Sequence, residues 1–459
     1  MSKVGKRVQI RTRLASDRVK DFNEVELPIS EEEAIKEASR DIKYCVAPCM
    51  NRGCPVNVEI PTMLKLVSQG KIKDAYESLI TRTPVPSITG RVCQQEIQCE
   101  GSCVLDKLGE PIAIGAIEKF VGDWALENGI EIGVSSQRKG KSVAVVGSGP
   151  AGIVVASELQ RAGYDVTIFE AFHEPGGVLT YGIPEFRLPK RIVRKEFEKL
   201  KNVGVELELG SVIGTTYTVD ELLKNFNAVF LGVGAGRPMF LNVPGENYAN
   251  IYTANEFLTR VNLMKSYKFP EYDTPLHIGR KVAVIGAGNT AMDAARSALR
   301  LGAETYIIYR RGRAEMTGRA VEVHHAEEEG VKFMFYSSPS EFLAADGVDV
   351  SGIKIMKMKP GEPDRTGRPR PVPTGETVEF DVDMVITAIG FYPNPLIPGT
   401  TPTLKTDDHG RVVVDLEGRT SIKGVYAGGD IVTGESTVIE AMGWGRRVAK
   451  TIDKDLLRV

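Results

Sequence analysis

Two glycine-rich turns, each placed between a short apolar strand and a helix, constrain the fold of this chain more than any other feature. The first turn, GSGPAG, follows the strand SVAVV at 142–146 and precedes a helix and a second strand, DVTIFE. In this G-x-G-x-x-G pattern the first glycine makes the turn, the second lets the backbone approach a pyrophosphate, and the third permits close helix–strand packing. Glu170 ends the second strand, where a carboxylate can accept ribose hydroxyls. The residues that we expect to bind a dinucleotide here are Gly147, Gly149, Gly152 and Glu170.

The same unit recurs farther along the chain. The strand KVAVI at 281–285 leads into GAGNTA, a helix and the strand TYIIYRR. Arg310 and Arg311 stand where the first unit has its acid, and a guanidinium group binds a 2′-phosphate that a carboxylate would repel. We therefore expect an unphosphorylated adenosine ribose at the first site and NADPH at the second; the alternative is that both arginines lie in a solvated loop. The residues expected to contact NADPH are Gly286, Gly288, Asn289, Thr290, Arg310 and Arg311.

Two later stretches are assigned to the first site, so that the nucleotide-binding domains are nested. DMVITAIG at 383–390 is a strand that runs into a glycine turn, and VYAGGD at 425–430 is a strand followed by a helix that starts near Ser436. Strands that alternate with helices predict Rossmann-like α/β domains with parallel sheets. The expected divisions are a helical N-terminal domain at 1–140, a first nucleotide domain at 141–240 and 380–459, and a second one inserted at 241–379.

All the cysteines lie in the N-terminal segment, whose apolar spacing at 30–130 predicts mostly helices. They are Cys45, Cys49, Cys54, Cys93, Cys99 and Cys103. In bacterial ferredoxins the cysteine before a proline ligates the other of two clusters, so Cys54 before Pro55 predicts interleaved iron–sulfur ligation by the two groups of three. Zinc is the alternative, but C-x2-C knuckles are absent and none of the five histidines lies in this segment. A disulfide framework is uncommon in a large intracellular enzyme.

The composition argues against several other classes of protein. Hydrophobic residues make up 42% and charged residues 26% of the 459, and the net charge is −2, which is typical of a globular chain without a nucleic-acid footprint. No apolar run approaches the ~20 residues of a membrane span, and we expect a soluble, cytoplasmic protein. A disulfide reductase would need a cysteine pair near its flavin, and no cysteine follows Cys103. A sensor without enzymatic activity is disfavoured by the intact glycines of both turns.

Several motifs together resemble those of the glutamate synthase small subunit family. They are GSGPAG with Glu170, GAGNTAMDAAR, YRRGRAEM, and AGGD followed by TVIEAMGWGRRVA. The stretches DFNEVELPISEEEAIKEASR, GRVCQQEIQCEGSC and EVHHAEEEGVKF look more like one branch of that family. This branch comprises the large subunit of NADH-dependent reduced ferredoxin:NADP oxidoreductase and the alpha subunit of sulfide dehydrogenase. The N-terminal module of dihydropyrimidine dehydrogenase is similar too.

The resemblance implies three-layer, glutathione-reductase-like domains that bind FAD and NADPH, after an N-terminal domain with two 4Fe–4S clusters. It implies that Cys45, Cys49 and Cys103 hold one cluster, and that Cys54, Cys93, Cys99 and Glu118 hold the other. Asp41 stands where the family has a further cysteine, so the first cluster is expected to have an aspartate ligand. The alternatives are a 3Fe–4S cluster with three cysteines and a different oxygen, nitrogen or solvent ligand. The remaining FAD contacts that the family implies are Gly390, Gly429, Asp430 at the ribityl chain, and Thr437 and Val438 at a helix N-terminus.

The resemblance further implies an oxidoreductase that passes electrons between NADPH, FAD and the clusters, with no catalytic side chain beyond the flavin. Its expected partner is a second redox subunit, either a flavin/2Fe–2S subunit or a glutamate synthase large subunit, or else ferredoxin, and electron bifurcation stays open. A stand-alone NADPH-dependent sulfur or polysulfide reductase is the other alternative. The basic N-terminal arm at 3–18 is either a solvated extension or a docking arm for a partner.

Overall fold

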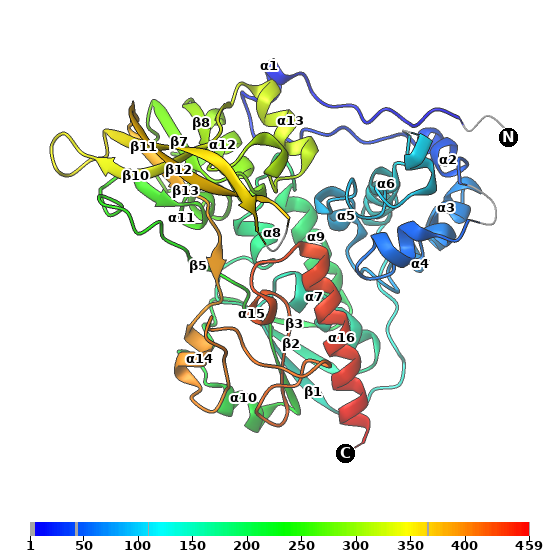
Figure 1. The fold of residues 1–459 in the computed structure, drawn as a ribbon. Coiled ribbons are helices and arrows are strands. Elements are labelled where there is room, and N and C mark those ends of the chain that lie inside the picture. The colour runs from blue at the N-terminus through cyan, green and yellow to red at the C-terminus, as the bar shows by residue number, and fades with distance from the viewer. Residues whose placement is uncertain (1–4, 42–44, 109, 365–366, 459) are drawn as a thin grey trace.

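The computed structural model describes residues 5–41, 45–108, 110–364 and 367–458 (Figure 1). The N-terminal part is helical, as expected, and α2 begins with a capping box in which Ser30 and Glu33 bond each other's backbone N–H. The helix α6 presents Ile114, Ile117 and Val121 to the core at helical spacing. The helices of this part are α2 (Glu31–Ala38), α3 (Ile60–Ser68), α4 (Ile72–Leu79), α5 (Pro86–Val92) and α6 (Ile114–Glu127).

A five-stranded parallel sheet in the order β15-β4-β1-β2-β3 forms the first nucleotide module. The C-terminal strand β15 pairs with β4, with Val425 opposite Val229, so a segment almost 200 residues later in the chain completes this sheet. Its strands are β1 (Ser142–Val146), β2 (Asp165–Phe169), β3 (Glu206–Glu208), β4 (Ala228–Leu231) and β15 (Val425–Ala427). Its helices are α7 (Pro150–Arg161), α8 (Val178–Tyr181), α9 (Lys190–Asn202), α10 (Val219–Asn225), α14 (Leu396–Thr400), α15 (Asp430–Thr433) and α16 (Val438–Leu457).

A second parallel sheet, in the order β6-β13-β7-β8-β9, forms the inserted module. Its strands are β6 (Ile251–Thr253), β7 (Lys281–Ile285), β8 (Glu304–Ile308), β9 (Lys332–Met334) and β13 (Met384–Thr387). Its helices are α11 (Ala254–Leu258), α12 (Asn289–Arg300) and α13 (Ala320–Glu329). Assigning the strand at 383–390 to the first module is wrong, because β13 lies between β6 and β7 in the second sheet. A buried run such as MVIT suits either sheet, and only its lateral pairing decides between them.

The described residues also form two smaller sheets. An antiparallel sheet of β10 (Ser337–Leu343), β11 (Gly352–Pro363) and β12 (Pro369–Asp381) projects from the second module (Figure 1). The strands β5 (Arg237–Pro238) and β14 (Phe391–Tyr392) pair where the chain passes between the two modules. Within the described residues, the helices are all too short or too polar to cross a membrane.

The N-terminal arm runs from the helical domain across to α13 and back (Figure 1). Its short helix α1 (Ala15–Arg18) ends on Arg18, whose side chain is 1% exposed and pairs with Glu329 at 2.7 Å and Glu328 at 2.8 Å. On the return path Val25 donates its N–H to the carbonyl of Phe186 at 3.0 Å. At Arg18 the arm is therefore neither solvated nor free for a partner, because this side chain binds the chain's own second module.

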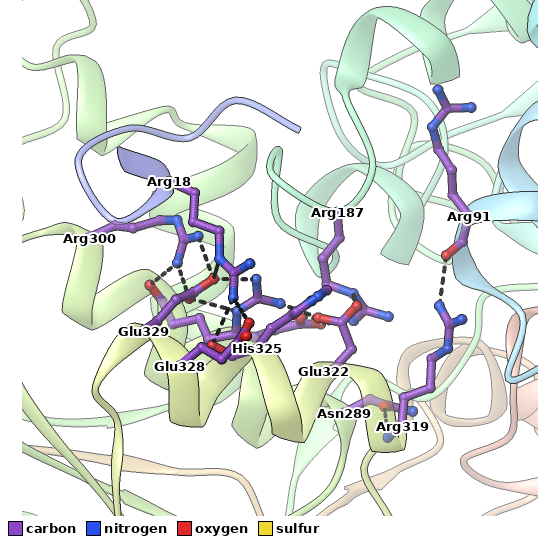
Figure 2. Close-up of polar contacts among 12 residues, drawn as sticks. Arg18, Arg91, Arg187, Asn289, Arg300, Arg319, Glu322, His325, Glu328 and Glu329 are labelled. Atoms are coloured by element: carbon purple, nitrogen blue, oxygen red, sulfur yellow. Dashed lines mark hydrogen bonds and ion pairs between the residues drawn. The ribbon is translucent and has the colours of Figure 1, made fainter. Parts of the chain in front are cut away.

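A buried network of charges holds α13 in place (Figure 2). The fully buried carboxylate of Glu329 forms ion pairs with the guanidinium groups of Arg18, Arg296 and Arg300, each with an N···O distance of 2.7 Å. At the other end of α13, Glu322 pairs with Arg296 and with Arg187, which also binds Asp293. Such charges are stable in a protein interior only while each keeps its partners.

We expect Arg18→Gln to lower the free energy of unfolding of the second module by about 3 kcal/mol, the lower end of the range for breaking a buried ion pair. The lower end applies because Glu329 keeps Arg296 and Arg300. The control is Arg11→Gln, which removes an exposed pair with Glu33 and should cost less than about 1 kcal/mol. Urea unfolding followed by circular dichroism measures both; equal effects of the two variants would contradict the buried anchor.

Candidate functional site

The first glycine turn has the geometry of a pyrophosphate cradle at the N-terminus of α7. Gly147 adopts φ 96°, and a Cβ on Gly152 would lie 1.9 Å from the carbonyl oxygen of Gly147, so both positions require glycine. A Cβ on Gly149 would meet no atom within 4 Å, and no side chain caps α7. The N-terminus of α7 is therefore uncapped and has open space beside Gly149, which suits an anion.

Glu170 lies at the end of β2 beside this turn, as the sequence predicts. Its carboxylate is buried and accepts hydrogen bonds from the N–H of Ser148 at 3.0 Å, from the Ser148 hydroxyl, and from the N–H of Phe172 at 2.9 Å. A carboxylate has about four acceptor positions, so room is left for a ribose hydroxyl.

The C-terminal segment brings Asp430 and the N-terminus of α16 to the same module. Gly429 adopts φ 77°, and Asp430 follows it at the start of α15. Burial raises the pKa of Asp430 to about 6, and the Ser436 hydroxyl donates a hydrogen bond to it. Thr437 caps α16 directly before Val438 by accepting from the N–H of Glu440.

The helix α16 also contacts the cysteine segment of the N-terminal domain. A Cβ on Gly445 would lie 2.4 Å from the carbonyl oxygen of Ala151, which places α16 tightly against α7. On the same helix, a Cβ on Gly443 would lie 3.3 Å from Val56 and 3.8 Å from the carbonyl oxygen of Pro55. The residues that follow Cys54 therefore pack directly on the helix that borders the first nucleotide site.

Gly390 lies where the chain leaves β13 for β14. It adopts φ 114°, and its carbonyl oxygen accepts a hydrogen bond from the N–H of Met239 at 3.0 Å. A Cβ at this position would lie 3.2 Å from the carboxylate of Glu435, just before α16. Gly390 is thus near the first site although the strand before it belongs to the second sheet.

The second glycine turn repeats the geometry of the first at the N-terminus of α12. Gly286 adopts φ 132°, and the nearest atom to a Cβ on Gly288 would be the hydroxyl of Thr317 at 3.5 Å. Asn289 begins α12 and accepts a hydrogen bond from the N–H of Arg319 at 2.8 Å; Thr290 follows, half-buried.

The two arginines after β8 differ in their surroundings. Arg310 is exposed, and its side chain makes no hydrogen bond or ion pair with the residues described. Arg311 donates to Asp364 at 2.8 Å and to the carbonyl oxygen of Pro369 at 3.1 Å, both beside the turn between β11 and β12. Arg310 is therefore available to a phosphate, whereas Arg311 is already engaged.

Cys54, Cys93 and Cys99 meet Glu118 in one buried neighbourhood. Burial raises the pKa of Cys93 well above its usual value, and the nearby charges of Glu118 and Cys54 raise it further. Burial likewise raises the pKa of Cys99 well above its usual value, and the nearby charges of Glu100, Glu118 and the other two thiols raise it further. Burial also raises the pKa of Glu118 to about 7, although Thr89 donates a hydrogen bond to it at 2.5 Å.

Cys45, Cys49 and Cys103 meet in a second neighbourhood, together with Asp41. Burial raises the pKa of Cys49 to about 12, and the charges of Cys103, Cys45 and Asp41 each raise it further. Asp41 is thus close enough for its charge to act on Cys49. Ligation of two clusters by these two groups, as Cys54 before Pro55 predicts, stays a prediction.

Among the described residues, no three His, Cys, Asp or Glu side chains converge tightly enough to hold one metal ion.

Two family models match the chain. Residues 141–445 match the family described as pyridine nucleotide-disulphide oxidoreductase, and residues 18–130 match dihydropyrimidine dehydrogenase domain II, 4Fe-4S cluster. Fold and site together define an NAD(P)H-dependent oxidoreductase with FAD- and NADPH-binding domains and a 4Fe–4S domain. The chain belongs to the pyridine nucleotide-disulphide oxidoreductase family and, within it, to the glutamate synthase small subunit group.

Individual relatives agree with this assignment. The chain is 37% identical over 450 residues to the glutamate synthase (NADPH) small chain of Azospirillum brasilense, covering 96% of this chain and 92% of that one. It is 37% identical over 445 residues to the beta subunit of NADP(+)-dependent formate dehydrogenase of Moorella thermoacetica, covering 90% and 60%. The structure of Mycobacterium tuberculosis FprA in complex with NADPH matches with TM-score 0.58 at 22% identity, covering 69% of this chain and 85% of FprA. The last match confirms the fold of the nucleotide modules.

Sequence reasoning missed three residues that support these sites. Ser148 lies inside the GSGPAG turn and could have been noted there, since its hydroxyl binds Glu170. Thr89 and Arg319 carry no local signal, because their partners lie 29 and more than 220 residues away in the chain.

We expect Arg310→Gln to reduce kcat/KM for NADPH roughly tenfold to a hundredfold, since a hydrogen bond to a charged group contributes about 1.5–3 kcal/mol. NADH lacks the 2′-phosphate, so its kcat/KM should stay unchanged. Arg311→Gln is the matched control and should have a smaller effect, because Asp364 already binds that guanidinium group. Steady-state kinetics with both nucleotides make the comparison; an unaltered preference in Arg310→Gln would refute this role.

Proposed function

We propose that the chain passes electrons between NADPH, FAD and two iron–sulfur clusters, and from there to or from a partner. The observation that carries this proposal is the contact of Gly443 in α16 with Pro55 and Val56, directly after Cys54. It brings a candidate cluster ligand against the helix that borders the first nucleotide site. A bound flavin exchanges electrons in pairs with a nicotinamide and singly with clusters. Converting electron pairs into single electrons therefore requires a cluster next to the flavin site.

The residues of the first module would bind and orient the flavin nucleotide. The N-terminus of α7 would take the pyrophosphate, Glu170 the ribose hydroxyls, and Asp430 the ribityl chain. The N-terminus of α16, at Thr437 and Val438, would place a positive helix end toward the flavin ring. In the second module the N-terminus of α12 would take the pyrophosphate of NADPH, and Arg310 its 2′-phosphate.

Two clusters are proposed from the two neighbourhoods. Cluster 1 would be held by Cys45, Cys49, Cys103 and Asp41, and cluster 2 by Cys54, Cys93, Cys99 and Glu118. An oxygen donor is a harder ligand than thiolate and holds cluster iron less securely. Cluster 1 is therefore expected to lose iron readily and to interconvert with a 3Fe–4S form. The proximity of Asp41 to Cys49 supports Asp41 as the fourth ligand rather than a cluster held by three cysteines alone.

The partner is proposed to be a second redox subunit. Two relatives are named as subunits, the glutamate synthase small chain and the formate dehydrogenase beta subunit, which supports work in a complex. A flavin/2Fe–2S subunit or ferredoxin would suit a ferredoxin-linked or bifurcating enzyme. The second candidate function is the NADPH-oxidising small subunit of glutamate synthase, favoured by the match over 92% of that relative's length. Identifying the proteins that co-purify with the native chain distinguishes the two.

We expect Cys99→Ala to abolish electron transfer to one-electron acceptors while flavin reduction by NADPH continues. The reason is that the nucleotide modules contain no cysteine and bind their nucleotides with separate residues. Stopped-flow absorbance measures flavin bleaching, and cytochrome c reduction measures the one-electron branch. Loss of bleaching in a variant that still holds FAD would contradict the modular arrangement.

We expect Asp41→Ala to convert a 4Fe–4S signal into a 3Fe–4S signal, and Asp41→Cys to protect cluster 1 from oxidative iron loss. EPR of the oxidised protein and iron analysis follow both changes. Glu110→Ala, at an exposed carboxylate of the same domain, is the control and should leave the spectrum unchanged. An unaltered spectrum with full iron in Asp41→Ala would show that this carboxylate is not a ligand.

A further inference from the structure

Arg319 connects the second nucleotide site to the loop that carries Cys93 and Cys99. It stands directly before α13, and its backbone N–H donates to the Oδ1 of Asn289, the first residue of α12, at 2.8 Å. Its side chain turns toward the N-terminal domain and is only 11% exposed. Figure 2 shows the guanidinium group reaching Arg91 on a separate part of the fold.

The guanidinium group of Arg319 holds the loop on both sides of Cys93. It donates to the carbonyl oxygen of Arg91 at 3.0 Å, to the Oε1 of Gln95 at 2.7 Å, and to the Oε2 of Glu96 at 3.1 Å. Arg91 lies two residues before Cys93, and Gln95 two residues after it. A planar group with several fixed donors is suited to binding three acceptors at once, here one at the end of α5 and two in the loop that follows it.

Among the described residues, Arg319 is the side chain that donates a hydrogen bond to Glu96. The Glu96 carboxylate needs this hydrogen bond from Arg319, because its other oxygen, Oε1, is shielded from solvent and has no hydrogen-bond partner among the described residues. Arg91 is committed to Asp123 at 2.6 Å and to Glu24 at 2.8 Å. The other end of the loop has its own arginine, because Arg7 pairs with Glu100, the residue after Cys99.

We propose that Arg319 is a positioning residue for cluster 2, which fixes the Cys93–Cys99 loop and raises the reduction potential of the cluster through its charge. This inference rests on the proposed function. Reduction adds a negative charge to the cluster, and a positive charge held nearby in a medium of low dielectric stabilises the reduced state. The negative charge of Glu96 lowers the reduction potential of the cluster, so the potential reflects the combined effect of the Arg319 and Glu96 charges.

The test is an EPR-monitored redox titration of the purified protein and three variants. Arg319→Gln is expected to shift the midpoint potential of the cluster 2 signal to more negative values, whereas Arg319→Lys, which keeps the charge, should retain most of the parent value. Arg313→Gln is the matched control: it removes the same charge from a surface pair with Glu327, where the arginine is 60% exposed, and should leave the potential unchanged.

A fourth variant separates charge from support of the loop. Glu96→Gln should shift the potential to more positive values, opposite in sign to Arg319→Gln, and it stays informative if Arg319→Gln fails to retain iron. Unchanged potentials in both Glu96→Gln and Arg319→Gln, or shifts of the same sign, would overturn the inference. A parent protein with no iron–sulfur signal would instead overturn the proposed function.

Discussion

The pairing of Glu329 with three arginines is the interaction on which the arrangement of this molecule depends. Arg18 comes from the N-terminal arm, and Arg296 and Arg300 come from successive turns of α12. The carboxylate is fully buried, and its charge is stable in the low-dielectric interior because guanidinium groups surround it. The effect is that α13, α12 and the arm form one group, although the arm lies more than 250 residues before both helices in the chain.

That group determines where Arg319 stands, and through it where the Cys93–Cys99 loop stands. A second set of buried contacts fixes the helical domain to the first module: Ser87 donates to Glu196, and Lys199 donates to the hydroxyl of Tyr76 at 2.7 Å. The helical domain is thus tied to both nucleotide modules by paired, buried polar groups. Electron transfer between sites on separate domains needs such fixed geometry, and these pairs provide it.

The two nucleotide modules share the glycine turn but differ in the residue that ends the second strand. Each has a glycine turn before a helix N-terminus that no side chain caps, which suits a pyrophosphate; a Cβ on Gly149 would meet open space, and one on Gly288 would meet only the Thr317 hydroxyl, at 3.5 Å. They differ at the end of the second strand, where Glu170 is buried among hydrogen-bond donors and Arg310 is exposed. The carboxylate suits neutral ribose hydroxyls and the arginine suits a phosphate, which is the basis of the proposal that the first module binds FAD and the second NADPH.

The sequence by itself determined the local units. The strands β1 at 142–146 and β7 at 281–285 have the bounds that their apolar runs predict, because a glycine turn and its flanking strand and helix depend on neighbouring residues. The interleaved ligation by the two groups of three cysteines, inferred from Cys54 before Pro55, stays a prediction. Tertiary structure alone decided that β13 joins the second sheet and that Arg18 is buried against α13. It also decided that Arg311 pairs with Asp364 and that Arg319 binds the cysteine loop. Each of these depends on partners 50 to more than 300 residues away, and burial and pairing at such separation leave no pattern in the neighbouring sequence.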